Sequence, residues 1–244
     1  MESEPLLEAV ERENRALARA AEGNLARQVP GCPGWDVAQL VRHLGAVHRW
    51  AAGIVREHVE ARPQRHNEPS EPADEVLLPW FLEGLEELLR TFRSVDPEKP
   101  CWTWTGQAPP QWWRRRQALE AAVHRVDVEQ ATGTSHPIVE GELSVTGVDE
   151  MLDIFIPWQR LPEELGPVGR TLHLHATDRE GEWMLRLRAG GIDVERGHAK
   201  GDAALRGPAS DLFLFLWNRI EVGALELFGD PAVPEIYVRH ARRD

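Results

Sequence analysis

Two side chains that can bind a metal ion lie one helical turn apart in residues 116–127. Glu120 and His124 differ by about 40° around a helix, and Asp127 lies about 20° to the other side of Glu120. The opposite face, which we expect to be solvated, carries charged residues (Arg114, Arg115, Arg125 and Glu129). An inward-pointing carboxylate beside an imidazole is costly to bury unless something compensates the charge. A bound metal ion would compensate it.

Two plainer explanations compete with a metal. A Glu and a His four apart often form a weak surface pair, or a hydrogen bond between them satisfies both in the core. A third residue, His43, favours the metal. It lies at the edge of the apolar stripe of a separate helix, expected to run from the N-cap Asp36 to about residue 60. His48 lies at the other edge of that stripe, and we expect it to be structural or partly exposed.

Composition excludes several classes of protein. The chain has 244 residues, an apolar fraction of 42% and ten tryptophans, enough for a real core. The net charge of −12 is spread along the chain, whereas a nucleic-acid-binding protein needs a basic face. The acidic first residues do not resemble a signal peptide, and no apolar run reaches membrane-spanning length. With only two cysteines, a disulfide framework is not indicated, and we expect a cytoplasmic protein.

Periodicity predicts a mainly α chain with an α+β second domain. Apolar spacing indicates helices at residues 5–27, 37–60, 72–95 and 112–131, followed by a further helix near 147–159. We therefore expect a four-helix bundle over residues 1–160, whose core can hold a site built from facing helices. From residue 168 the pattern alternates as in half-buried strands, so residues 165–244 should form a small α+β domain.

Two motifs resemble one known family. The segment Val29-Pro-Gly-Cys-Pro-Gly-Trp-Asp-Val-Ala-Gln-Leu-Val-Arg-His-Leu-Gly45 is similar to the signature of the mycothiol-dependent maleylpyruvate isomerase family, and Glu120-Ala-Ala-Val-His-Arg-Val-Asp127 resembles its fourth helix. The resemblance implies a DinB-like metal-binding bundle and a sterol-carrier-like second domain. It also implies that His43, Glu120 and His124 bind a divalent metal, usually zinc, and that mycothiol is the co-substrate. The arginine-rich, lysine-poor composition is typical of GC-rich genomes, including those of actinobacteria.

Two imidazoles and one carboxylate leave a coordination position open, as in a catalytic zinc site. A thiol that enters this position is deprotonated and can attack an electrophilic carbon. Asp127 could orient a ligand histidine, or it could bond to a neighbouring helix. Arg219 could bind a carboxylate of substrate or thiol, although a solvated arginine at a helix end is the plainer interpretation. Tryptophans 102, 104, 112 and 113 could line a pocket near the metal.

We therefore expect a zinc- and mycothiol-dependent S-transferase or cis–trans isomerase that acts on a small electrophile, as a monomer or homodimer. A hydrolase that uses metal-bound water is an alternative, as is a non-catalytic metal-dependent sensor or carrier. His173 and His175 share one face of an expected strand and could be a second metal pair. Such residues more often face solvent, and no third ligand is near in sequence.

Overall fold

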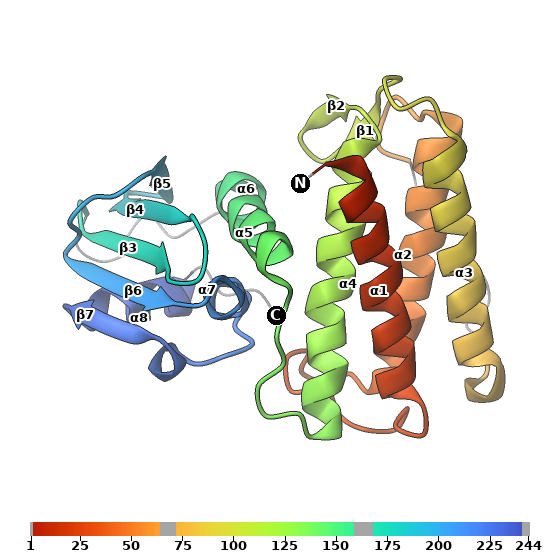
Figure 1. Ribbon diagram of the computed structural model, residues 1–244, viewed down its shortest axis with the longest axis horizontal. Helices are drawn as coiled ribbons and strands as arrows, with labels where there is room; N and C mark the ends of the chain where they lie inside the picture. Colours follow the sequence, from red (N-terminus) through yellow and green to blue (C-terminus); the bar gives the residue numbers. More distant parts are fainter. Residues whose placement is uncertain (1, 64–71, 159–167, 241–244) are drawn as a thin grey trace. The chain divides into compact units, whose positions relative to one another are not determined.

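The computed structural model describes residues 2–63, 72–158 and 168–240, and the chain divides into two compact units, Met1–Pro137 and Ile138–Asp244. Figure 1 shows that the first unit is helical and that the second contains a sheet. The expected fold class, a helical bundle followed by an α+β unit, is confirmed. None of the described helices is long and apolar enough to cross a membrane.

Four long helices build the first unit: α1 (Ser3–Ala21), α2 (Val37–Glu57), α3 (Asp74–Ser94) and α4 (Gln111–Thr132). Helix α1 packs mainly against α4, and α2 mainly against α3. A short hairpin of β1 (Cys101–Thr103) and β2 (Gly106–Ala108) connects α3 to α4. The apolar core is drawn from every helix, since Leu17, Leu44, Phe81 and Val128 belong to one buried cluster.

Local signals fix where α2 and α4 begin and end. Asp36 caps α2 as expected: its carboxylate accepts a hydrogen bond from the Gln39 backbone N–H at 2.8 Å, and the Gln39 side chain accepts one from the Asp36 N–H at 2.9 Å. Helix α4 ends at Gly133, whose φ of 105° is readily adopted only by glycine. These two ends set the positions of His43 and Glu120 along their helices.

The expectation of a solvated outer face on α4 is wrong. Arg114 and Arg125 are buried, and so is Arg116 next to the expected metal ligands. Arg125 donates through Nε to Glu13 of α1 at 2.6 Å and through Nη1 to Glu129 at 2.5 Å. Helix α4 contacts α1 as well as α2, so it has no single outer face, and Arg114, Arg116 and Arg125 are buried with their partners.

The second unit is built on a five-stranded sheet of order β5-β4-β3-β6-β7. Its strands are β3 (Thr171–Ala176), β4 (Glu182–Arg188), β5 (Gly191–Arg196), β6 (Ala203–Gly207) and β7 (Glu226–Gly229). Only the β3–β6 pair is parallel. Helices α7 (Ala209–Leu216) and α8 (Ala232–His240) and the one-turn 3₁₀ helix η2 (Val222–Ala224) complete this part.

The boundary between the units differs from the expected one at 160–165. Helix α5 (Gly141–Glu150) continues through a π-turn, η1 (Met151–Phe155), into α6 (Ile156–Trp158) and belongs to the second unit. Helix α5 packs on α7, where a Cβ at Gly147 would lie 2.4 Å from the Phe213 ring. A helical period alone does not tell which unit a connecting helix joins, because that depends on distant partners.

Candidate metal centre

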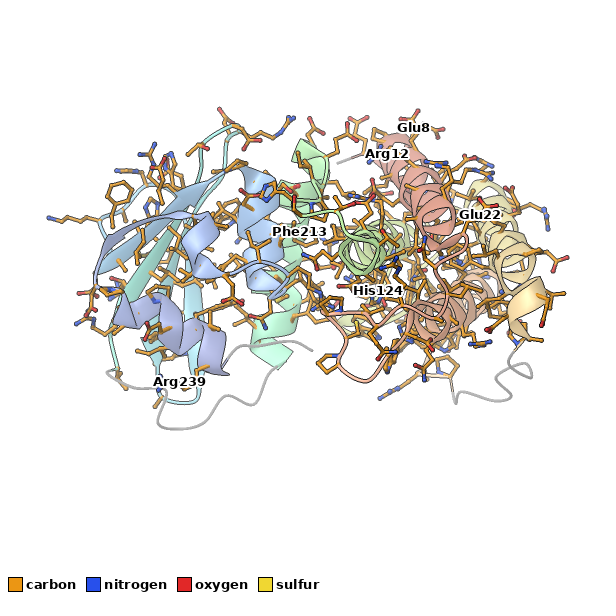
Figure 2. All side chains as sticks on the ribbon, turned by 90° about the horizontal axis from the view of Figure 1, so that it is seen from below. Glu8, Arg12, Glu22, His124, Phe213 and Arg239 are labelled. Carbon is orange, nitrogen blue, oxygen red and sulfur yellow. The ribbon has the colours of Figure 1, made fainter. Side chains whose placement is uncertain are left out.

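Helices α2 and α4 bring the three expected metal ligands together. The Nε2 atoms of His43 and His124 each lie 3.5 Å from Oε1 of Glu120. The three ligand atoms lie within 4.8 Å of one another. His124 is placed within the bundle in Figure 2, which views the helices roughly end-on. One helical turn of α4 thus supplies two groups, and the facing turn of α2 supplies the third.

The donor set fits a metal such as zinc. Zinc binds imidazole nitrogen and carboxylate oxygen at about 2.0–2.2 Å, so neighbouring ligand atoms of a tetrahedral site are roughly 3.3–3.5 Å apart. The two separations of 3.5 Å lie at this distance and are long for hydrogen bonds. The side chains of His43, Glu120 and His124 remain 31%, 19% and 13% exposed, so the cluster is open to solvent on one side. A fourth ligand could enter there.

Asp127 lies behind His124. Its carboxylate is fully buried, and Oδ2 is 2.9 Å from Nδ1 of His124. An Nδ1–H that donates to Asp127 leaves Nε2 with its lone pair toward Glu120, which is the tautomer that a metal ligand needs. Oδ2 also accepts a hydrogen bond from the Cys32 thiol at 3.6 Å.

Two residues at this site were missed by the sequence analysis. Arg116 forms an ion pair with Oε2 of Glu120, which leaves Oε1 facing the histidines, and its guanidinium lies 5.8 Å from the Trp104 ring centroid. Its spacing of four from Glu120 was a usable signal. No spacing in the sequence relates Cys32 to these residues, because it lies in the loop before α2 and reaches Asp127 of α4 only in the folded chain. A second possible ligand set, Cys32 with His124 and Asp127, overlaps the first.

The charges around the cluster favour a cation. Burial alone would raise the pKa of Glu120, but the Arg116 guanidinium and the neighbouring imidazoles hold this pKa well below its usual range. Burial would lower the pKa of His124, whereas hydrogen bonds to Asp127 and Cys32 hold it well above its usual value. The negative surroundings that favour the protonated form of His124 also attract a divalent cation. Metal binding at His124 would therefore release a proton.

Three other predictions from the sequence concern His48, Arg219 and the tryptophans at 102–113, none of which belongs to this group of ligands. His48 is fully buried against the Phe81 ring, which makes it structural rather than partly exposed. Arg219 is buried in the second unit and donates from Nη1 to the Trp217 carbonyl at 2.7 Å, so it is not a solvated arginine. The four tryptophans around residues 102–113 pack on one another and on Trp50.

The fold and the cluster define a class: a helical bundle with a candidate metal centre between two helices, followed by a small α+β unit. The family model of the mycothiol maleylpyruvate isomerase N-terminal domain matches residues 6–129, and that of the MDMPI C-terminal domain matches residues 142–235. The chain therefore belongs to the mycothiol-dependent maleylpyruvate isomerase family, and the expected family is confirmed.

Solved structures share this fold at low sequence identity. A crystal structure of a histidine-to-alanine mutant of the mycothiol-dependent maleylpyruvate isomerase matches with a TM-score of 0.67 and 11% identity, over 93% of each chain. A crystal structure described as the mycothiol-dependent maleylpyruvate isomerase matches with a TM-score of 0.61 and 13% identity, over 88% of each chain. Among curated proteins, none matches this chain.

Proposed function

We propose that this protein is an enzyme that holds a divalent metal, zinc, through His43, Glu120 and His124 and uses it to activate the thiol of mycothiol. In an S-transferase the thiolate would attack an electrophilic carbon of a small substrate and displace a leaving group. In a cis–trans isomerase it would add to a conjugated double bond and be expelled again after rotation about the bond. The observation that carries the proposal is the convergence of two imidazole nitrogens and one carboxylate oxygen at the solvent-open side of the cluster. Membership of a mycothiol-dependent family supports the choice of thiol.

When bound, the metal acidifies a coordinated thiol at neutral pH, so the protein needs no reactive cysteine of its own. Cys101 is not a reactive cysteine of this kind, because burial raises the pKa of its thiol to about 11. The chain supplies the geometry. Asp127 holds the proton on Nδ1 of His124, and Arg116 binds Oε2 of Glu120 so that Oε1 stays directed at the histidines.

Arg219 is proposed as the group that binds a carboxylate of the thiol or the substrate. Arg219 is buried and donates from Nη1 to the Trp217 carbonyl at 2.7 Å. A guanidinium suits bidentate recognition of a carboxylate. The conservative variant Arg219→Lys tests this role, because it keeps the charge and loses the bidentate geometry. We expect a higher KM for substrate or thiol with little change in kcat. A folded variant with an unchanged KM for both contradicts the role.

Metal analysis tests the site. We expect zinc to co-purify with the wild-type chain and to be lost from the centre in His43→Ala and Glu120→Gln, since each removes one of three ligands. His136→Ala is the matched control, because His136 is an exposed histidine outside the cluster. If His43→Ala and Glu120→Gln bind as much zinc as His136→Ala, these side chains are not ligands.

Thiol consumption tests the chemistry. With zinc bound, the wild-type chain should accelerate the loss of mycothiol thiol in the presence of an electrophile, or the cis–trans conversion of a conjugated alkene, and His43→Ala should not. A zinc-loaded protein that hydrolyses esters or amides without mycothiol points to the alternative in which bound water is the nucleophile.

A further inference from the structure

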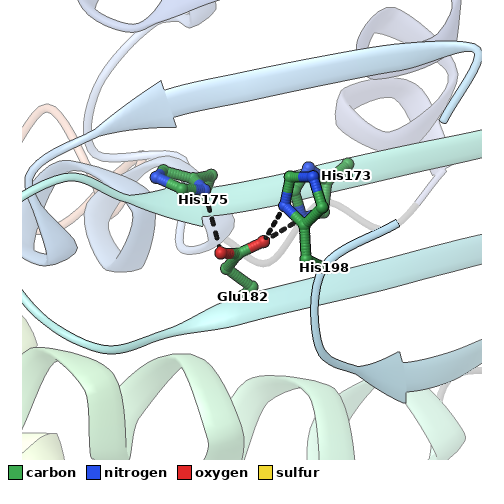
Figure 3. Close-up of side chains that lie close together, drawn as sticks. All are labelled: His173, His175, Glu182 and His198. Carbon is green, nitrogen blue, oxygen red and sulfur yellow. Dashed lines mark hydrogen bonds and ion pairs between the residues drawn. The ribbon is translucent and has the colours of Figure 1, made fainter. Parts of the chain in front are cut away.

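A second group of potential metal ligands lies on the sheet of the second unit, in a part of the chain that the proposed chemistry does not use. His173 and His175 of β3, Glu182 of β4 and His198 after β5 offer four ligand atoms within 4.8 Å of one another. Figure 3 shows the three imidazoles gathered around the Glu182 carboxylate. From the sequence, a solvent-facing pair was the plainer interpretation of His173 and His175, but His173 is buried and His175 is only partly exposed. The further ligands, Glu182 and His198, come from other segments of the chain.

Strand register places the first three ligands. Residues two apart on β3 share a face, and His175 pairs directly with Glu182 in the antiparallel β3–β4 ladder. Oε1 of Glu182 lies 3.3 Å from Nδ1 of His175, and Oε2 lies 3.0 Å from Nε2 of His173. One carboxylate therefore reaches both imidazoles from the neighbouring strand.

A glycine turn brings the fourth ligand. Gly197 ends β5 with a φ of 114°, and its N–H donates to the Glu182 carbonyl at 3.0 Å. The next residue, His198, is thereby placed over the start of β4, with Nδ1 2.7 Å from Oε2 of Glu182. The His173 and His198 ring centroids are 5.4 Å apart, at an interplanar angle of 89°.

A cluster held only by hydrogen bonds and ion pairs accounts poorly for these contacts. Nε2 of His173 is buried at 3.0 Å from the carboxylate, yet it makes no hydrogen bond of acceptable geometry to the described residues. A buried imidazole nitrogen that faces a carboxylate without a hydrogen bond has a position open for a metal ion that both groups bind.

We propose that His173, His175, Glu182 and His198 form a second divalent metal site, distinct from the centre between α2 and α4. Three imidazoles and one carboxylate select a transition metal of the zinc type over Mg²⁺ or Ca²⁺, which prefer oxygen ligands. Four protein ligands fill a tetrahedral shell, so this site is structural. The bound ion links β3, β4 and the turn after β5, which fixes one edge of the sheet.

Zinc stoichiometry tests the proposal, with the full-length protein dialysed against zinc after chelator treatment. We expect two equivalents for the wild type and for the control His136→Ala. Removing His198, whose side chain is 78% exposed, should weaken one site at least about tenfold without unfolding the chain. Glu182→Gln should do the same, because it removes the only charged ligand but keeps the side-chain shape.

The two sites are separated by crossing the variants. His43→Ala should keep the equivalent bound by the sheet, and His43→Ala combined with His198→Ala should bind that equivalent at least about tenfold more weakly. At a zinc concentration near the dissociation constant of the sheet site in His43→Ala, zinc should also raise the Tm of His43→Ala more than that of the double variant, because the ion stabilises the folded state only where it binds. If folded His198→Ala and Glu182→Gln bind the sheet equivalent as tightly as His136→Ala, or if His43→Ala binds no zinc, the second site does not exist.

Discussion

Asp127→Asn tests whether the buried carboxylate of Asp127 strengthens metal binding by His124 at the proposed centre. The substitution keeps the volume of a fully buried side chain and leaves one oxygen that can accept the Nδ1 proton of His124. It removes the negative charge behind the imidazole and replaces one acceptor oxygen with an NH2 donor. If the role of Asp127 is to fix the tautomer and raise the basicity of His124, the charge is the part that matters.

The expected loss of zinc affinity follows from the position of Asp127, which contacts the proposed ligand His124. Loss of such a partner weakens metal binding by roughly 10–100-fold, which corresponds to about 1.4–2.7 kcal/mol. The loss of a direct ligand in His43→Ala should be far larger. At the bundle site, Asp127→Asn should therefore retain zinc at saturating concentration and lose it in competition with a chelator, whereas the bundle site of His43→Ala holds no zinc in either condition.

The assay is zinc competition titration of folded protein, with Glu129→Gln as the matched control. Glu129 lies on the same helix and makes the same loss of charge, but its carboxylate binds Arg125 rather than a ligand histidine. We expect Glu129→Gln to bind zinc within about twofold of the wild type. An Asp127→Asn affinity equal to that of Glu129→Gln refutes the reasoning, because it leaves Asp127 as a bundle contact only.

Four further substitutions, one of them a control, test other parts of the structure. Cys32→Ala should retain zinc, because the thiol bonds to Asp127 and is not needed as a ligand; loss of the metal would favour the ligand set that includes Cys32. His48→Leu should raise the free energy of unfolding by about 1–3 kcal/mol at pH 7 in urea titrations, because neither buried ring nitrogen has a hydrogen-bond partner in the described structure. Burial lowers the pKa of His48 to about 3, so between pH 6.5 and 3 the folded state binds fewer protons than the unfolded chain. The folded state therefore loses stability as the pH falls through that window. His48→Leu should reduce this loss, and an unchanged pH dependence of stability contradicts the prediction. Gly147→Ala should lower the free energy of unfolding by about 1–3 kcal/mol, because the added methyl meets the buried Phe213 ring. In the control Gly53→Ala the added methyl meets nothing within 4 Å, so this substitution should raise the free energy of unfolding by about 0.5–1 kcal/mol. Equal effects of the two substitutions would contradict the packing argument.

Helical periodicity was sufficient to place Glu120, His124 and Asp127 on one stripe, because the three lie within two turns of one helix. It also placed His43 on the inner edge of α2, because the Asp36 cap fixes where that helix begins. The inference that an outer arginine face leaves the stripe inside was wrong, although the stripe is where it was expected. Burial depends on how many neighbours a helix has, and α4 contacts α1 as well as α2.

The ligands that the sequence did not reveal are those placed by pairing between distant strands. His173 and His175 were visible as a spacing-two pair, but Glu182 becomes their neighbour only through the β3–β4 register. His198 joins them only because β5 pairs with β4 and ends at the left-handed Gly197. Each of these steps depends on a register that a single sequence does not specify.

The two ligand clusters differ in the number of protein ligands they offer, and we therefore propose different roles for them. The bundle cluster offers three candidate ligands, partly exposed side chains and a buried carboxylate behind one histidine, which suits an ion that must accept a further ligand. The sheet cluster has four protein ligands and joins segments that only strand pairing brings together. An ion there adds stability but has no free position for a thiol. Loss of the sheet ion should therefore lower the Tm and leave the kcat for thiol transfer unchanged at temperatures where the protein is folded. Loss of the bundle ion should abolish that activity.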